Sequence, residues 1–292
     1  MRDIASEPAP AKVNLALHVV GQREDGFHLL HMLCVFTELA DLVSAQPAET
    51  DALTVSGPFG PDLPIGRSNL VWRALEKFRA RFPDHLPAGL AIHLEKHLPV
   101  ASGLGGGSAD AAAVLRLLGR ISTQPVADGD LFALAATLGS DVPMCLLSQT
   151  CEVSGVGEQI LPLQTFPRLY LVLVNPLEQV STPNVFRALL HKQNDPMPPV
   201  PEPFDRAALV SLWLSDTRND LETPAKALVP AIGPVIAAIG ATSGCVVARM
   251  SGAGATCFGL YGSAGAAHQA AHDLREHFPT YWIAATPILT SA

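Results

Sequence analysis

The most constraining feature of the sequence is a glycine-rich segment, in which four of the five residues from 103 to 107 are glycine. An alternating stretch, residues 90–98, predicts a β-strand before it, and an Ala/Leu-rich stretch predicts a helix from about Ser108 to Arg120. Glycine allows close approach to a ligand and positive φ angles, while a helix N-terminus offers unpaired N–H groups and the positive end of the helix dipole. We therefore predict that the segment binds the phosphate chain of a nucleotide; the alternative is a flexible connector into a core helix.

Several familiar motifs are missing from this region. The chain has no Gly-Lys dipeptide, which excludes the P-loop of nucleotide hydrolases. A dinucleotide-binding GxGxxG pattern starting at Gly103 would need glycine where Ser108 stands, and the nucleophile elbow GxSxG fails at Asp110. Residues 93–97 imitate a zinc-protease motif, but their glutamate lies one place late and the stretch alternates like a strand. A phosphate-binding role of this segment would therefore be of a class other than these three.

The composition restricts the expected partners and location. A formal net charge of −8 argues against a general surface for nucleic acid or anionic membranes. Five scattered cysteines without a CxxC pair favour reduced thiols and argue against a zinc site or disulfide framework. An uncharged stretch, residues 227–248, contains prolines and glycines that favour a buried helix, a turn and a strand over a membrane span. We expect a cytoplasmic protein that binds small molecules and has no nucleic-acid or membrane partner.

Length and element order indicate two domains of class α+β. The 292 residues reach the length at which single hydrophobic cores stop growing, and 48% apolar residues suffice for packed cores. Strand patterns cover residues 12–19 and 168–175, and helix patterns follow Asn69, which can cap the first of them, and span residues 264–277. The elements alternate without a regular βαβ rhythm, which favours α+β over a doubly wound sheet.

Three segments resemble the three motifs of the GHMP small-molecule kinases, in the same order and spread over nearly the whole chain. They are residues 10–15 (PAKVNL), 99–109 (PVASGLGGGSA) and 250–258 (MSGAGATCF). The resemblance implies a two-domain fold with an N-terminal domain like ribosomal protein S5 domain 2 and a ferredoxin-like C-terminal domain. We expect the domains to span residues 1–167 and 168–292. The resemblance also implies ATP and Mg²⁺ as cofactors.

Four further segments resemble one branch of these kinases. They are PAKVNLALHV with the following Asp-Gly-Phe-His of residues 25–28, then residues 138–143, 180–186 and 219–222. Members of this branch use ATP to phosphorylate the 2-hydroxyl of a cytidine-diphosphate-linked methylerythritol, a step of non-mevalonate isoprenoid synthesis. The resemblance implies the same activity and substrate here.

The resemblance also assigns the catalytic and nucleotide-binding residues. Asp141 would accept the proton of the attacking hydroxyl, and Lys12 would lie beside that hydroxyl and the transferred phosphoryl group. The sequence alone favours simpler interpretations, namely a helix cap for Asp141 and a solvated strand lysine for Lys12. The nucleotide-binding residues implied by the motif are Pro99, Val100, Ala101, Ser102, Gly103, Leu104, Gly105, Gly106, Gly107, Ser108 and Ala109.

By the same resemblance, the substrate-binding residues are Asn14, Phe27, His28, Thr182 and Phe186. Phe27 and Phe186 would stack on cytosine, His28 would hydrogen-bond to it, and Thr182 would orient the diphosphate or sugar. Relatives often have Tyr where Phe27 stands, so stacking is kept and a hydroxyl contact is lost. The alternative for both phenylalanines is ordinary core packing.

The remaining polar residues near the motifs are less specific. We expect Ser108 to cap the helix and to reach a phosphate oxygen or Mg²⁺, while no acidic pair indicates a metal site. Asp110 lies in the first helical turn, where an acid is stabilised by the helix dipole, and receives no catalytic role. Residues 251–254 either pack beside the glycine-rich segment or form a plain turn.

Two alternatives remain open at the level of the sequence. The chain can be another GHMP kinase, acting on mevalonate, homoserine or a sugar. It can also be a nucleotide-binding protein without catalysis, which the presence of both Lys12 and Asp141 disfavours.

Overall fold

The structure, a computed structural model, describes residues 5–61 and 63–290. Its strands are β1 (Ala5–Gln22), β2 (His28–Ala48), β3 (Ala52–Ser56), β4 (Gly89–Glu95), β5 (Cys151–Gly155), β6 (Gln159–Pro162), β7 (Tyr170–Asn175), β8 (Cys245–Met250), β9 (Cys257–Tyr261) and β10 (Trp282–Pro287). Its helices are α1 (Leu70–Arg81), α2 (Gly106–Ile121), α3 (Asp128–Ala136), α4 (Val142–Leu147), α5 (Thr182–Ala188), α6 (Ala207–Ser215), α7 (Glu222–Leu228), α8 (Ile232–Ala241) and α9 (Ala264–His277).

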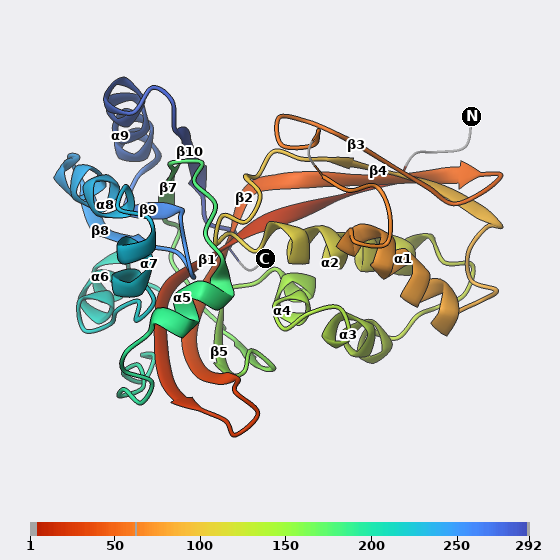
Figure 1. Cartoon of the computed structure of the whole chain (residues 1–292), viewed down its shortest axis with the longest axis horizontal. Coiled ribbons are helices and arrows are strands. Elements are labelled where there is room, and N and C mark those ends of the chain that lie inside the picture. The colour runs from red at the N-terminus through yellow and green to blue at the C-terminus, as the bar shows by residue number, and fades with distance from the viewer. Residues whose placement is uncertain (1–4, 62, 291–292) are drawn as a thin grey trace. The chain divides into compact units, whose positions relative to one another are not determined.

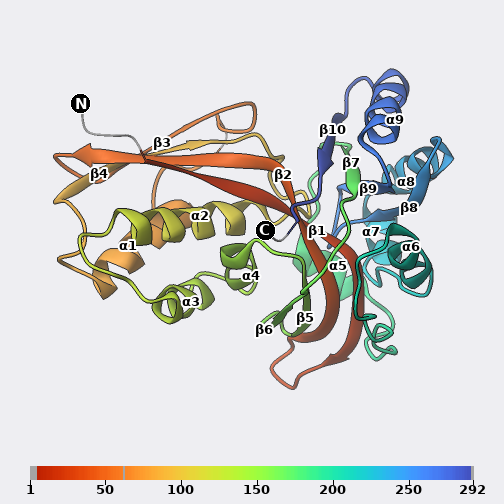
Figure 2. The same ribbon diagram turned by 180° about the vertical axis from the view of Figure 1, so that it is seen from behind.

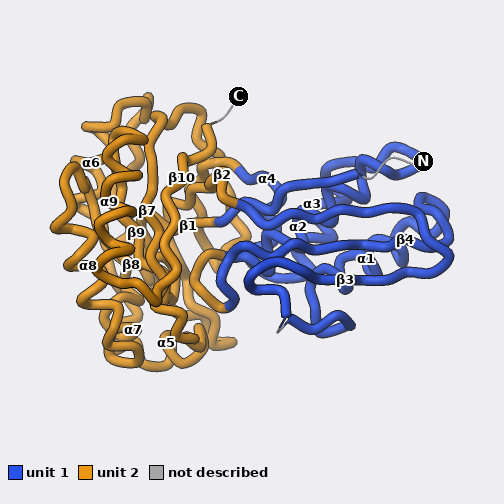
Figure 3. The backbone as a smooth tube through the Cα atoms, turned by 90° about the horizontal axis from the view of Figure 1, so that it is seen from above, with its two compact units in different colours: residues 1–11, 40–100, 105–148 blue, residues 12–39, 101–104, 149–292 orange. Residues whose placement is uncertain are grey.

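The chain forms two compact units that exchange segments along the sequence (Figure 3). Unit 1 holds residues 40–100 and 105–148 with the start of β1, and unit 2 holds residues 12–39 and 101–104 and all described residues after 148. The strands β1 and β2 each contribute residues to both units. The domain boundary after residue 167 stays a prediction.

Unit 1 is a layer of helices against strands. β3 pairs in parallel with β4, and β4 pairs antiparallel with the second half of β2. Figures 1 and 2 show α1 to α4 gathered on one side of β3 and β4. The predicted cap of α1 is confirmed, because the Asn69 side chain accepts a hydrogen bond from the N–H of Val71. The alanine-rich face of α2 is buried, and its small side chains let α1 and α4 pack closely on it.

Unit 2 is built on an antiparallel sheet with the strand order β10-β7-β9-β8. Helices separate β7 from β8 and β9 from β10, and α8 and α9 pack on the sheet. Numbered along the chain, this is a βαββαβ unit with strand order 4-1-3-2, so the ferredoxin-like prediction is confirmed. The first half of β2 pairs separately with β5, which pairs with β6.

The uncharged stretch at 227–248 folds as the sequence predicts. It forms the end of α7, the helix α8, a turn and most of β8. No helix in the described part of the chain is long and apolar enough to cross a membrane.

Candidate active site

The glycine-rich segment joins β4 to α2 and leaves backbone donors at the start of the helix. Gly105 is the N-cap, with φ at +64°, and the first intrahelical hydrogen bond runs from the Ala109 N–H to the Gly105 carbonyl at 2.9 Å. The N–H groups of Gly106, Gly107 and Ser108 therefore have no partner within the helix. This is the arrangement that binds anions at helix N-termini.

The helix begins at Gly106 rather than near Ser108, so the predicted capping role of Ser108 is wrong. Ser108 lies inside the first turn, and no side chain caps this helix. Glycines have low helix propensity and no capping side chain. The helical pattern of α2 can therefore be recognised in the sequence only from Ala109 onward.

The turn of residues 251–254 packs directly on the glycine-rich segment. Gly103 has a φ of +79°, and a Cβ built on it would lie 2.5 Å from the carbonyl oxygen of Ser251 and 2.9 Å from that of Gly254. The Ser251 hydroxyl donates to the Gly103 carbonyl at 3.0 Å. Only glycine fits at position 103, because backbone of the third motif occupies the space of a side chain.

Lys12 and Asn14 lie on β1 and are buried, with exposed fractions of 5% and 1%. The interpretation of Lys12 as a solvated strand lysine is therefore wrong. Its Nζ donates to Asn14 Oδ1 at 2.7 Å, while Asn14 Nδ2 faces two sulfur acceptors, Met32 Sδ at 3.3 Å and Cys34 Sγ at 3.2 Å. A buried ammonium needs polar partners, and the Asn14 side-chain oxygen is one of them.

Asp141 is the N-cap of α4, but its carboxylate makes no capping hydrogen bond. A helix cap therefore does not explain this acid. Asp141 belongs to unit 1 and Lys12 to unit 2, and their pairing in catalysis stays a prediction.

The residues predicted to bind cytosine lie together in unit 2. The rings of His28 and Phe186 are stacked, with centroids 4.7 Å apart and an interplanar angle of 27°. The Phe27 side chain is 63% exposed, so core packing does not explain it, and Thr182 begins α5 at the surface. His28 Nε2 is buried without a hydrogen-bond partner. Burial lowers the pKa of His28, and the charge of Lys192 lowers it further, which favours a neutral ring.

Comparison with known proteins identifies the family. The models of the GHMP kinases N terminal domain and the GHMP kinases C terminal match residues 69–149 and 204–280. A 4-diphosphocytidyl-2-C-methyl-D-erythritol kinase of Agrobacterium fabrum is 48% identical, covering 96% of this chain and 95% of the relative. One of a Chelativorans species is 45% identical over 95% and 94%. A crystal structure of 4-(cytidine 5'-diphospho)-2C-methyl-D-erythritol kinase has a TM-score of 0.80 and 36% identity, covering 99% of this chain and all of the other.

The chain belongs to the family of 4-diphosphocytidyl-2-C-methyl-D-erythritol kinases. It is thus an ATP-dependent small-molecule kinase with the two-domain GHMP kinase fold, mixed α/β with two sheets, as the sequence predicts. The glycine-rich segment lies within the first matched range and the turn of residues 251–254 within the second.

In this family member a buried ionic cluster supports the start of α2, and the sequence did not reveal it. Lys96 Nζ donates to Asp41 Oδ2 at 2.6 Å and to Asp110 Oδ2 at 2.5 Å, and all three residues are at most 3% exposed. A Cβ on Gly106 would lie 3.0 Å from Lys96 Nζ. The cluster therefore packs against the first residue of the helix, and the spacing of these residues in the chain gave no signal of it.

The two carboxyl groups of the cluster differ in their hydrogen bonding. Asp41 Oδ1 accepts from the N–H groups of His97 and Leu98, whereas Asp110 Oδ1 is buried without a partner. Burial raises the pKa of Asp110 to about 8, although the charge of Lys96 opposes this. Burial acts to lower the pKa of Lys96, but the two carboxylates outweigh it and raise that pKa. Burial thus favours the protonated form of Asp110, while the Lys96 ammonium contacts both carboxyl groups.

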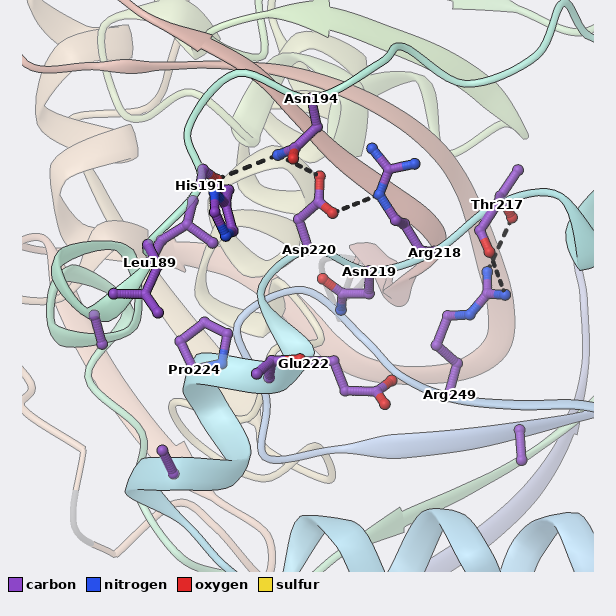
Figure 4. Close-up of a pocket in the computed structure, with 15 residues that line it drawn as sticks. Leu189, His191, Asn194, Thr217, Arg218, Asn219, Asp220, Glu222, Pro224 and Arg249 are labelled. Carbon is purple, nitrogen blue, oxygen red and sulfur yellow. Dashed lines mark hydrogen bonds and ion pairs between the residues drawn. The ribbon is translucent and has the colours of Figure 1, made fainter.

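A cavity of about 590 Å³ lies in unit 2 beside the turn before α7 (Figure 4). Several of its polar side chains bind one another and nearby backbone. Arg249 donates to the carbonyls of Leu15, Leu214 and Thr217, and Asp220 accepts from Arg218 and Asn194. With these groups already engaged, the wall is a hydrogen-bonded frame, and we do not assign substrate binding to it.

Proposed function

We propose that this protein transfers the terminal phosphoryl group of ATP to the 2-hydroxyl of 4-diphosphocytidyl-2-C-methyl-D-erythritol, in the methylerythritol phosphate pathway to isoprenoid precursors. The observation that carries the proposal is identity of 45–48% over about 95% of the chain with kinases named for this substrate. The small molecule is the expected partner, and the cytoplasm stays the predicted location.

Residues 99–109 bind the phosphates of ATP in this proposal. The uncapped N–H groups at the start of α2 and the positive end of its dipole supply the attraction. Gly107 contributes an open backbone surface, since a Cβ on it would meet only Leu70, at 3.6 Å.

Lys12 and Asp141 perform the chemistry. The Asp141 carboxylate accepts the proton of the attacking 2-hydroxyl, and the Lys12 ammonium offsets the negative charge that gathers on the transferred group. Asn14 fixes the direction of Lys12 through the 2.7 Å hydrogen bond to its Nζ. Phosphoryl transfer asks a protein mainly for such positioning and charge stabilisation.

The ring pair of His28 and Phe186 recognises the cytosine, with Phe27 as the second aromatic. The orphaned Nε2 of a neutral His28 can donate to or accept from the polar edge of the base, which satisfies the buried atom. Phe186 supplies the π face for stacking, and Thr182 at the start of α5 contacts the diphosphate or sugar.

ATP implies Mg²⁺, which neutralises phosphate charge when bound. Among residues 5–61 and 63–290, no group of three or more His, Cys, Asp or Glu side chains is placed to hold a metal ion. This fits an ion bound mainly by phosphate oxygens and water, and the Ser108 hydroxyl is the protein oxygen that we propose for it.

A coupled assay of ADP release with alternative acceptors tests the proposal. We expect turnover with the cytidine-linked alcohol and at least 100-fold lower kcat/KM with mevalonate, homoserine or galactose. Preference for one of these smaller alcohols would move the protein to another branch of the GHMP kinases. Nucleotide binding without turnover on any acceptor would indicate a non-catalytic protein and refute the proposal.

A further inference from the structure

Asn219 holds the third motif with both donors of its side-chain amide. It precedes α7, is 7% exposed, and its Nδ2 donates to the carbonyls of Met250 and Gly252 at 2.8 Å each. Its Oδ1 accepts from the N–H of Leu221 at 3.0 Å. Figure 4 shows Asn219 in the turn that borders the cavity, between Arg218 and Asp220. Two donors directed at two carbonyls fix the backbone on both sides of Ser251.

Ser251 connects the third motif to the other two by hydrogen bonds. Its hydroxyl donates to the Gly103 carbonyl at 3.0 Å and accepts from the Asn14 N–H at 3.1 Å, and the residue is fully buried. Gly252 and Gly254 have φ angles of +56° and +87°. Because glycines restrict their own backbone weakly, outside contacts must hold this turn in one conformation.

The segment that carries Asn219 is itself fastened to β1. The Leu17 N–H donates to the Arg218 carbonyl and the Asp220 N–H donates to the Leu17 carbonyl, both at 2.9 Å. The Asp220 carboxylate accepts from the Val19 N–H at 2.7 Å. Asn219 therefore connects the strand of Lys12 and Asn14 with the turn that touches Gly103.

We propose that Asn219 is a positioning residue for nucleotide binding. It holds the turn of residues 251–254 against Gly103 and so fixes the bend of the glycine-rich segment. The inference rests on the proposed binding of ATP phosphates by that segment, but not on the identity of the phosphate acceptor.

The test is Asn219→Ser, with calorimetric binding of ADP and steady-state kinetics as readouts. Serine keeps a hydroxyl that can accept from the Leu221 N–H, so the local turn is retained, but it is too short to reach the two carbonyls. We expect the Kd for ADP and the KM for ATP to rise at least tenfold, with less than a threefold change in KM for the cytidine-linked acceptor. Asn219→Asp fills the same volume without the donors, and serves if the serine variant does not fold.

Asn194→Ser is the matched control. Asn194 lines the same cavity, and its amide also donates to two carbonyls, those of Val19 and His191, but it does not touch the turn of residues 251–254. Its third bond, to the Asp220 carboxylate at 3.3 Å, is one of three there, and those from the Val19 N–H and Arg218 remain in the variant. We expect its Kd for ADP to stay within twofold of the wild type. A folded Asn219 variant with wild-type ADP affinity, or an equal weakening in Asn194→Ser, would overturn the inference. ADP binding needs no phosphate acceptor. The Kd comparison therefore tests the role of Asn219 even if the protein does not phosphorylate the proposed substrate.

Discussion

Replacing Gly103 with alanine should weaken folding rather than block a ligand. The backbone at φ +79° costs an L-residue about 1–2 kcal/mol. The new Cβ would meet the carbonyl oxygens of Ser251 and Gly254 at 2.5 and 2.9 Å, and overpacking of this kind costs about 1–3 kcal/mol. The sum, roughly 2–5 kcal/mol, should lower the Tm by roughly 4–20 °C.

Gly107→Ala is the matched control in the same segment. Its Cβ would lie 3.6 Å from Leu70 Cδ1, an ordinary contact, in a helical residue. Alanine is better than glycine within helices by about 0.5–1 kcal/mol, so the Tm should hold or rise slightly. If phosphates approach this backbone, however, the added methyl group should raise the KM for ATP about tenfold.

Thermal unfolding and ATP kinetics of the two variants, measured side by side, distinguish folding from binding. Gly103→Ala with an unchanged Tm would refute the packing argument. Gly107→Ala with an unchanged KM for ATP would show that the phosphates do not approach this glycine.

Three further predictions concern catalysis, protonation and base recognition. Asp141→Asn should lower kcat by roughly 10²–10⁴ while ADP affinity stays within twofold, and normal turnover would remove Asp141 from the mechanism. The pKa of Asp110, about 8 in the folded protein and 3.8 ordinarily, means that its contribution to stability is full below pH 3.8 and is lost as the pH rises to about 8. Urea unfolding at pH 5 and pH 8 measures this effect. Between these pH values the free energy of unfolding of the wild type should fall by up to about 1.4 kcal/mol per pH unit more than that of Asp110→Asn. An equal fall in both proteins would refute the assignment. Phe186→Ala should raise the KM for the cytidine-linked acceptor by about 5- to 150-fold, the equivalent of roughly 1–3 kcal/mol of base stacking, without changing the KM for ATP; an unchanged acceptor KM would exclude stacking on this ring.

Local patterns predicted most elements because short-range physics determines them. The capping of α1 by Asn69, the span of α9 and the helix, turn and strand within residues 227–248 follow from periodicity and turn residues in a few consecutive positions. The start of α2 was placed two residues late, because glycine carries no local helix signal.

The sequence by itself determined a glycine-rich segment between a strand and a helix, and three motifs in the order of one kinase superfamily. The tertiary structure decided which side chains meet. Asn14 and Ser251 are 237 residues apart, and Lys96 is 55 residues from Asp41, yet both pairs are hydrogen-bonded in buried surroundings. The solvation of a side chain depends on everything packed around it, so the burial of Lys12, the raised pKa of Asp110 and the hydrogen bonds of Asn219 arise only when distant segments exclude water together.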